Sequence, residues 1–266
     1  MRKKRSHRRT RPHFPHAHSE HDQENPAVDD DFGVPIPGLP LAEEQWARTG
    51  IKQLPPPGPL SWPDWFGREA PVVLDLGCGN GRFVITSAML RPECDHVGLD
   101  ALPLVIRYAT RRANQRGLTN VRMIVSGAYE FLEQYVAPGS VQEIHLYHPQ
   151  PFREKRKELA ARRLVSPAFL ALVHRSLSTN GLLVIQTDNR AYWGYMRKVI
   201  PEFFIFEEQT GPWPDMPQGR TRREIYARQH QMPVYRASAH PRAEVTPERI
   251  KALVATLPLP RFDAGK

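Results

Sequence analysis

Residues 72–81 read VVLDLGCGNG, and this stretch decides the fold. Its first five residues are aliphatic or β-branched apart from Asp75, which predicts a buried parallel strand. The strand runs into three glycines, Gly77, Gly79 and Gly81, and the residues after them predict a helix over 83–90. Glycines at a strand end let the backbone turn sharply and let a ligand approach main-chain atoms with no Cβ in the way. A glycine turn without a ligand is the alternative interpretation of this stretch taken alone.

The spacing of the glycines indicates the kind of ligand. A dinucleotide fingerprint needs its third glycine one residue later, where this chain has Arg82. A phosphate loop needs Gly-Lys-Ser/Thr, which is absent from the stretch. A strand followed by Asp-x-Gly-x-Gly-x-Gly is typical of methyltransferases that use S-adenosylmethionine. We therefore expect Gly77 and Gly79 to bind this cofactor and Asp75 to orient its amino group, directly or through water.

A second landmark supports the same cofactor. Residues 96–100, HVGLD, predict the next strand, which ends in Asp100. An acid about 20 residues after the glycine loop is where doubly wound folds bind a ribose, because a carboxylate can accept both hydroxyl protons of the diol. Such an acid can also cap a helix. The two landmarks at matched spacing favour the cofactor site.

Composition limits the partners. The chain has 266 residues and a net charge of +9, but seven of its 37 Lys and Arg residues lie in 1–12, which leaves 30 basic against 28 acidic residues elsewhere. Attraction to a polyanion must therefore come from the tail or from local patches. Cys78 and Cys94 form no disulfide framework and no metal spacing, which fits a reducing, cytoplasmic setting. No apolar run reaches transmembrane length and no signal peptide is visible, so we expect neither a membrane nor a metal partner.

The chain divides by composition into four regions. A basic block, four histidines and a run of acids ending at Asp31 predict a disordered tail. Many prolines with Trp46, Trp62 and Trp65 then predict an irregular arm that docks on the domain, since a free linker has little use for tryptophans. The predicted boundaries are 1–31 for the tail, 32–70 for the arm, 71–237 for a methyltransferase domain and 238–266 for a C-terminal extension.

Strands and helices are predicted to alternate through the domain. The expected strands are 72–76, 96–100, 121–125, 141–146 and 182–187, and the expected helices are 83–90, 102–113, 129–135 and 167–177, with a turn at Asn180-Gly181 and a last helix over 247–255. This order predicts an α/β, Rossmann-like class I S-adenosylmethionine-dependent methyltransferase fold, a mostly parallel sheet with helices on both faces. Ligands of such sheets bind at the carboxyl ends of the strands. Those ends present Gly77 and Gly79, Asp100, Gly127 and Ala128, residues 147–151, and Asp188.

Three segments resemble the bacterial tRNA (guanine-N7-)-methyltransferase family, over about residues 70–237. Residues 148–156, HPQPFREKR, with Arg-Arg-Leu at 162–164, are similar to the family's Pro-Asp-Pro-Trp run and its basic residues. Residues 186–189, QTDN, with Tyr192, are similar to its Thr-Asp strand end. Residues 221–224, TRRE, and 233–236, PVYR, are similar to its Thr-x-x-Glu and Pro-hydrophobic-Tyr-Arg motifs, which no general methyltransferase fold requires.

The chain departs from the family pattern at three positions, which identifies it as a divergent member. The family's acid between the two prolines falls on Gln150. Its acid after the third strand, which would hold the adenine amino group, falls on Gly127, next to Ala128. Its lysine after the Pro-Asp-Pro-Trp run falls on Glu154, with Lys155 adjacent.

The resemblance implies transfer of a methyl group from S-adenosylmethionine to N7 of a guanine in tRNA, in the variable loop. N7 carries an in-plane lone pair at neutral pH, so catalysis reduces to holding the reacting atoms close, aligned and dry. A carboxylate can orient guanine and stabilise the positive charge that grows on the purine. The implied residues are Asp188 and Gln150 for catalysis; Asp75, Gly77, Gly79, Asp100, Gly127, Ala128 and Gln150 for the cofactor; and Lys155, Asp188, Thr221, Arg222, Arg223 and Glu224 for the substrate.

Each assignment has an alternative. Asp188 could cap the helix that begins near Asn189, and Glu224 could pair with Arg220 or Arg228.

The candidates for contacts with tRNA phosphates are the basic residues Arg153, Lys155, Arg156, Lys157, Arg162 and Arg163, with Arg220, Arg222 and Arg223 beside the pocket. Two other functions remain open: a methyltransferase acting on another RNA or a small molecule, and a non-catalytic RNA-binding relative. We expect a monomer or a homodimer.

Overall fold

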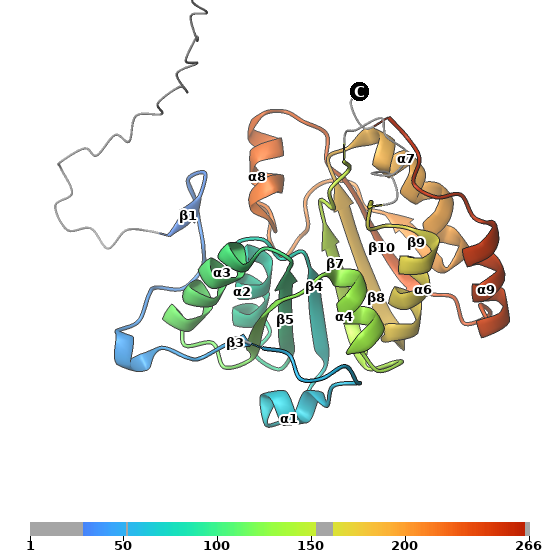
Figure 1. The fold of residues 1–266 in the computed structure, drawn as a ribbon. Coiled ribbons are helices and arrows are strands. Elements are labelled where there is room, and N and C mark those ends of the chain that lie inside the picture. Colours follow the sequence, from blue (N-terminus) through green and yellow to red (C-terminus); the bar gives the residue numbers. More distant parts are fainter. Residues whose placement is uncertain (1–28, 52, 153–161, 264–266) are drawn as a thin grey trace, which may run out of the picture.

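The glycine-rich stretch begins as β4 (Val72–Leu76), a strand buried at every position in the centre of the sheet. The computed structural model describes residues 29–51, 53–152 and 162–263. Its main sheet has the strand order β3-β6-β5-β4-β7-β8-β10-β9, and the first six strands are parallel (Figure 1). The other strands of this sheet are β3 (Gly50–Ile51), β5 (Asp95–Asp100), β6 (Val121–Val125), β7 (Val141–Tyr147), β8 (Leu177–Thr187), β9 (Phe204–Glu208) and β10 (Tyr235–Pro241).

Helices cover both faces of the sheet, as predicted (Figure 1). α2 (Arg82–Leu90) and α3 (Pro103–Gln115) bury their apolar side chains against one face. α4 (Ala128–Gln134), α6 (Pro167–Ser176) and α7 (Arg190–Val199) pack on the other, and α9 (Pro247–Thr256) lies against α6. α1 (Trp62–Phe66) lies within the arm, and α8 (Arg222–Gln229) stands at the carboxyl ends of the central strands.

The five predicted strands are all present, but the sheet has eight strands. β3 is two residues long and lies in the proline-rich arm, where no periodicity can be seen. β9 and β10 are antiparallel to their neighbours. β9 reads FIFEE and buries Phe204 while Ile205, Glu207 and Glu208 are exposed, as suits an edge strand with one face in solvent. The predicted boundary between residues 237 and 238 falls inside β10.

The predicted turn at Asn180-Gly181 lies within β8, which runs without interruption from Leu177. The residues around it form an irregularity rather than a loop, because Leu177 pairs with Val141 while Leu182 pairs with Glu143. The extra β8 residues bulge out of the ladder, so Asn180 and Gly181 lie at a register shift within the strand instead of in a turn before it.

The predicted tail differs from the structure at its last three residues. Asp29 and Asp31 are held by arginines of α2 and α3, and Asp30–Asp31 forms β1, which pairs with β2 (Val34–Pro35). Residues 1–28 lie outside the described residues. In the arm, Trp62 is buried and its indole N–H donates to Ser140 Oγ at 3.2 Å, so this aromatic fastens the arm to the domain.

Candidate functional site

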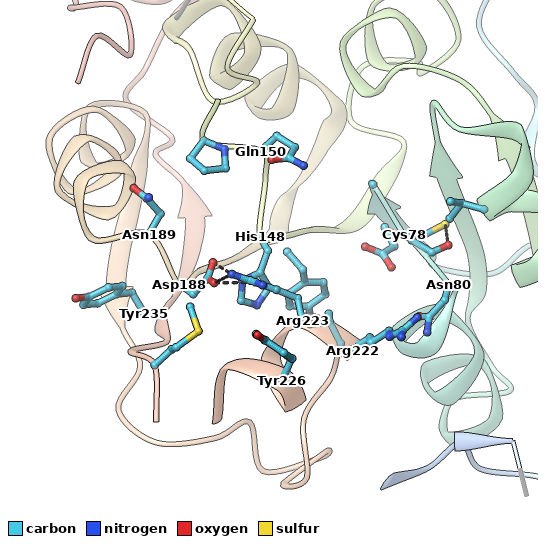
Figure 2. Close-up of a pocket in the computed structure, with 18 of the residues that line it drawn as sticks. Cys78, Asn80, His148, Gln150, Asp188, Asn189, Arg222, Arg223, Tyr226 and Tyr235 are labelled. Atoms are coloured by element: carbon cyan, nitrogen blue, oxygen red, sulfur yellow. Dashed lines mark hydrogen bonds and ion pairs between the residues drawn. The ribbon is translucent and has the colours of Figure 1, made fainter. Parts of the chain in front are cut away.

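A pocket of about 1420 Å³ lies at the carboxyl ends of β4, β7 and β8, between the glycine loop, the first turn of α3 and α8. Figure 2 shows the Asp188 and His148 side chains in its centre, with Gln150 above them and Tyr226 below. Ligands of doubly wound sheets bind at this edge. The predicted site residues that line the pocket are Asp75, Gly77, Gly79, Gln150, Asp188, Thr221, Arg222 and Arg223.

The glycine loop presents bare backbone to the pocket. Gly77 and Gly79 have φ values of +83° and +55°, a region that favours glycine. A Cβ placed on either residue would have no heavy atom within 4 Å, so each would project into open space. Both glycines line the pocket, and a ligand can therefore approach their main-chain atoms directly.

Asp75 is a buried carboxyl whose surroundings fit a cofactor. The residue is 2% exposed, and its Oδ1 atom has no hydrogen-bond partner among the described residues. Burial, with a smaller contribution from the nearby Asp100, raises the pKa of this carboxyl to about 8. Buried polar atoms are nearly always satisfied, so an unpaired one facing a pocket indicates a partner that arrives with the ligand. A cationic ammonium group, as in S-adenosylmethionine, fits this position.

Asp100, Gly127 and Ala128 lie beside the pocket and are not among the residues that line it. Asp100 Oδ2 accepts a hydrogen bond from Gly79 N at 3.3 Å, and Oδ1 accepts one from Leu102 N at 2.9 Å. The carboxylate thus ties the end of β5 to the glycine loop and also supports the start of α3. Gly127 follows β6 and has nothing within 4 Å of the place where a Cβ would be.

Asp188 is held in place by two cationic or proton-donating partners. Its Oδ1 lies 3.1 Å from His148 Nδ1, and its Oδ2 accepts from Arg223 Nε at 2.8 Å (Figure 2). Burial alone would raise the pKa of Asp188, but hydrogen bonds and charge from His148 and Arg223 hold it at about 2. Helix α7 is capped by Asn189, whose side chain accepts from Tyr192 N. The capping role considered for Asp188 therefore belongs to its neighbour.

Glu224 lies behind the pocket wall and is fully buried. Its Oε1 pairs with Arg236 Nη2 at 2.5 Å, and its Oε2 accepts from Arg220 N at 2.9 Å and from Gln186 Nε2 at 3.2 Å. The expected partners were the side chains of Arg220 or Arg228, and the observed ion pair is with Arg236. This pair joins the TRRE motif to the PVYR motif.

The TRRE motif also builds the helix that carries it. Thr221 precedes α8 and its Oγ1 accepts from Glu224 N at 3.1 Å, while the Glu224 carboxylate reaches back to Arg220 N. This is a variant of the capping box, in which two side chains satisfy free N–H groups at a helix start. Cap and ion pair together place Arg222 and Arg223 on the pocket side of α8.

Arg163 differs from its predicted role as a phosphate contact. It is 2% exposed and donates to the backbone carbonyls of Pro151, Phe152, Pro260 and Phe262 at 2.5–2.9 Å. A guanidinium enclosed by carbonyl groups stabilises the fold and is withdrawn from solvent. Arg163 therefore connects the C-terminal segment to the loop that carries Gln150.

Arg220 is likewise engaged within the fold. Its guanidinium pairs with Asp215 at 2.7 Å and donates to the Tyr147 hydroxyl at 2.9 Å. Lys155, with Arg153, Arg156 and Lys157, lies outside the described residues. Among the predicted basic contacts beside the pocket, Arg222 and Arg223 are the ones that line it.

Several site residues were not predicted. His148 stands in the HPQP segment but was given no role; it has a φ of +49° and bridges Asp188 and Gln186. Gln186 Nε2 donates to His148 Nε2 at 2.9 Å, which places the imidazole proton on Nδ1, the nitrogen that faces Asp188. Phe32 and Tyr226 also line the pocket. A histidine beside the prolines was a usable signal, whereas nothing in the local pattern pointed to Phe32.

No helix among the described residues is long and apolar enough to cross a membrane. Within the same ranges, no group of three or more His, Cys, Asp and Glu side chains is placed to hold a metal ion. Cys78 and Cys94 are both buried and unpaired.

Comparisons with known proteins agree with this geometry. A family profile described as "Putative methyltransferase" matches residues 69–237. A tRNA (guanine-N(7)-)-methyltransferase of Shewanella woodyi is 31% identical over 192 residues, which are 71% of this chain and 79% of the relative. One of Aeromonas hydrophila is 32% identical with the same coverage. The crystal structure of the 16S rRNA methyltransferase KamB superposes with a TM-score of 0.51 at 15% identity, over 73% of this chain and 98% of that one, and it shows the shared fold. This chain therefore belongs to the tRNA (guanine-N7-)-methyltransferase family.

Proposed function

We propose that this protein transfers a methyl group from S-adenosylmethionine to N7 of a guanine in tRNA. The observation that carries the proposal is one pocket with two unlike carboxylates. Asp75 beside the glycine loop has an unsatisfied oxygen, and Asp188 across the pocket is held ionised by His148 and Arg223. The first suits a cationic cofactor and the second suits a base that becomes positive as it reacts.

The cofactor half is formed by Asp75, Gly77, Gly79 and Asp100. When bound, S-adenosylmethionine supplies a methyl group on a sulfonium sulfur, which N7 attacks in line. Asp75 Oδ1 would accept a hydrogen bond from the amino group, and the bare glycine backbone lets the ligand lie close. Gly127 and Ala128 would border the adenine ring at the end of β6.

The acceptor half is formed by Asp188, Gln150 and the residues of α8. Asp188 would accept from the ring N–H and exocyclic amine of guanine and offset the charge that grows on the purine. The Gln150 amide would donate to guanine O6 or hold the methionine end of the cofactor. Arg223 is 45% exposed at its side chain, so it can leave Asp188 Oδ2 at small cost when a base arrives.

Glu224 acts through other residues in this proposal. Its carboxylate is enclosed by Arg236, Gln186 and the backbone of Arg220. It would therefore fix the orientation of Gln186 and, through it, of His148, which holds Asp188. Thr221 would serve the same end by starting α8 at the correct residue.

The substrate would be bound by its backbone and by its shape. Phosphate groups of the tRNA would be contacted by Arg222 and Arg223 at the pocket and by Lys155 with its basic neighbours. Such contacts position RNA without reading its sequence. We propose the variable loop as the target and the cytoplasm as the location, where tRNA is available and free cysteines persist. Assembly as a monomer or homodimer stays a prediction.

The test is to incubate the protein with unmodified bulk tRNA and methyl-labelled S-adenosylmethionine, digest the RNA and identify the labelled nucleoside. We expect 7-methylguanosine, formed about 100-fold more slowly in a parallel reaction with Asp188→Asn. A tRNA in which the variable-loop guanine is replaced by adenine should remain unlabelled. Label on another nucleoside would move the activity to a different acceptor. Cofactor binding without any label on tRNA would contradict the proposal.

A further inference from the structure

Three buried arginines hold a short N-terminal segment that lies outside the region matched by the family profile. Asp31 pairs with Arg82 at 3.2 Å, and Asp29 pairs with both Arg112 and Arg116. The three guanidinium side chains are 1–6% exposed. Arg82 also donates to the Val34 and Pro35 carbonyls, and Arg116 to that of Pro37. Buried charges are retained only when they are well paired, so this segment is an integral part of the fold.

The anchored segment is a hairpin whose tip is Phe32-Gly33. β1 and β2 pair with Asp31 opposite Val34, which leaves two residues in the turn. Their φ values are +54° and +78°, as a primed two-residue turn requires. Glycine adopts this region without cost, but for phenylalanine it is uncommon. A large aromatic residue in an unfavourable turn position points to a role beyond the turn itself.

The tip of the hairpin contacts α8 at the pocket. The Phe32 ring lies 5.6 Å from that of Tyr226, and the Arg222 guanidinium lies over the Phe32 ring at 4.8 Å. Gln229 Nε2 donates to the Phe32 carbonyl at 2.8 Å. Phe32, Arg222 and Tyr226 all line the pocket, and Phe32 is still 41% exposed. Figure 2 shows Arg222 extending from α8 toward Asn80 of the glycine loop.

We propose that Phe32, with Arg222 and Tyr226, forms a stacking wall that receives a nucleobase of the tRNA at the mouth of the pocket. The proposal rests on the proposed function and adds a substrate-binding residue from a segment outside the matched domain. Proteins bind unstacked RNA bases on aromatic rings and on arginine planes. The wall combines both, on the same helix that places Arg223 on Asp188.

The exposure of the wall favours a base over the cofactor. Phe32 contacts residues of α8, and its neighbour Asp31 accepts a hydrogen bond from Asn80 Nδ2 of the glycine loop at 2.7 Å, so the ring lies where the two sides of the pocket meet. Its partially exposed ring leaves apolar surface available to solvent beside a guanidinium, which suits a ligand that is both aromatic and attached to phosphate. A base that leaves the stack to reach the pocket needs such a surface to offset its unstacking.

The test compares binding of tRNA and of S-adenosylhomocysteine by Phe32→Ala, Phe32→Asn and Phe32→Tyr. Asparagine removes the ring while tolerating a positive φ, so Phe32→Asn separates loss of stacking from damage to the turn. We expect the tRNA Kd to rise about tenfold in the first two variants, in line with roughly 1–3 kcal/mol for one stacked base. Phe32→Tyr should retain wild-type affinity, and the Kd for S-adenosylhomocysteine should stay within about twofold of wild type.

Salt titration gives a second readout. Loss of a stacked base should leave the slope of log Kd against log salt unchanged, whereas Arg222→Met should flatten it, because a phosphate contact releases counterions. Leu39→Ala is the matched control, since Leu39 is 80% exposed in the same N-terminal segment and lies outside the pocket. It should bind tRNA as wild type does.

Two outcomes would overturn the proposal. Unchanged tRNA affinity in Phe32→Asn would remove the stacking role, and a matching loss of S-adenosylhomocysteine affinity would make Phe32 a cover for the cofactor. Because the Kd values are measured directly, these outcomes do not depend on whether the protein transfers a methyl group. A wild-type protein that binds tRNA without methylating it would contradict the proposed function and leave the stacking wall intact.

Discussion

On the glycine-loop side of the pocket, Asp75 has a buried oxygen without a hydrogen-bond partner among the described residues. On the α8 side, Asp188 and Glu224 are both saturated by arginine, histidine and glutamine. Burial raises the pKa of Asp75 to about 8. Burial acts in the same direction on Asp188, but hydrogen bonds and charge from His148 and Arg223 outweigh it and hold the pKa of Asp188 at about 2. One carboxyl therefore depends on its ligand for ionisation, and the other is ionised by the protein.

The difference shows how one fold prepares for two ligands. In the proposed function, the cofactor half can leave the Asp75 carboxyl unpaired because its ligand brings the cation. The acceptor half would need a negative charge before a neutral guanine arrives, and His148 and Arg223 provide for it by holding Asp188 ionised. Arg223 would leave Asp188 Oδ2 as the base binds, so the rearrangement precedes methyl transfer and the charge is in place for the reaction itself.

The largest expected effect is on stability, from breaking the buried pair of Glu224 and Arg236. Their side chains are 0% and 6% exposed. Arg236→Met leaves the Glu224 carboxylate enclosed without its cation and should lower the free energy of unfolding by about 3–5 kcal/mol. Urea denaturation measures this loss.

The matched control is Arg197→Met, which breaks an ion pair with Glu208 whose side chains are 57% and 45% exposed. It should cost less than about 1 kcal/mol. Adding Glu224→Gln to Arg236→Met should recover part of the lost stability, because no charge is left unpaired. Equal losses from the buried and exposed pairs would refute the structural role assigned to Glu224.

The next effect is on the rate. Asp188→Asn keeps the shape of the side chain but removes the charge, and kcat should fall about 100-fold, as when one electrostatic contact to a transition state is lost. The Kd for S-adenosylhomocysteine should stay near the wild-type value, since the change is confined to the acceptor half. Single-turnover methylation of tRNA measures the rate. A variant with normal kcat and weakened cofactor binding would reverse the assignment of the two halves.

A smaller effect concerns cofactor affinity and pH. With a pKa of about 8, Asp75 is mostly neutral at pH 7 in the free protein, and binding a cationic ammonium requires the ionised form. Below that pKa the Kd for S-adenosylhomocysteine should rise by up to about tenfold for each pH unit, because each unit costs about 1.4 kcal/mol. Binding is therefore weaker at pH 6 than at pH 8. Calorimetry in buffers of different ionisation enthalpy should also detect the proton that is released.

Asp75→Asn distinguishes titration of Asp75 from a loss of binding caused by partial unfolding of the protein at low pH. The variant should bind S-adenosylhomocysteine about 10-fold more weakly at pH 8, as expected for losing a hydrogen bond to a charged group. Its Kd should no longer change between pH 6 and 8. Persistence of the wild-type pH dependence in Asp75→Asn would show that another group binds the ammonium.

The cofactor half could be predicted well from sequence because its signals are local. The strand, the glycine spacing and Asp100 all lie within residues 72–100, and each follows from backbone geometry. The loop residues Gly77 and Gly79 line the pocket as expected, with positive φ values. The edge strands β3 and β9, and β10 beside β9, were missed because they depend on neighbours that are distant in sequence.

The acceptor half could be predicted only in part, since its contacts join distant segments. The sequence placed Asp188 correctly at a strand end, but the helix that begins after Thr221 was not predicted. The partners of Glu224 and Arg163 depend on the tertiary fold. A basic residue looks the same in sequence whether it binds phosphate or encloses backbone carbonyls. Phe32 lay in a predicted arm, and only the ion pairs of Asp29 and Asp31 reveal why it reaches the pocket.

The smallest expected effect is a gain. Gly127 occupies the position to which the family resemblance assigns an acid for the adenine amino group, and its φ of −72° suits any residue. A Cβ there would meet no heavy atom within 4 Å, so Gly127→Asp can be accommodated. The variant should lower the Kd for S-adenosylhomocysteine about threefold to tenfold, the worth of one hydrogen bond to a carboxylate, and leave tRNA binding unchanged. Gly58→Asp is the control, because Gly58 lies outside the pocket and a Cβ there would likewise meet no heavy atom within 4 Å. No gain in Gly127→Asp would place the adenine away from the end of β6, and the cofactor half would then consist of the glycine loop, Asp75 and Asp100 alone.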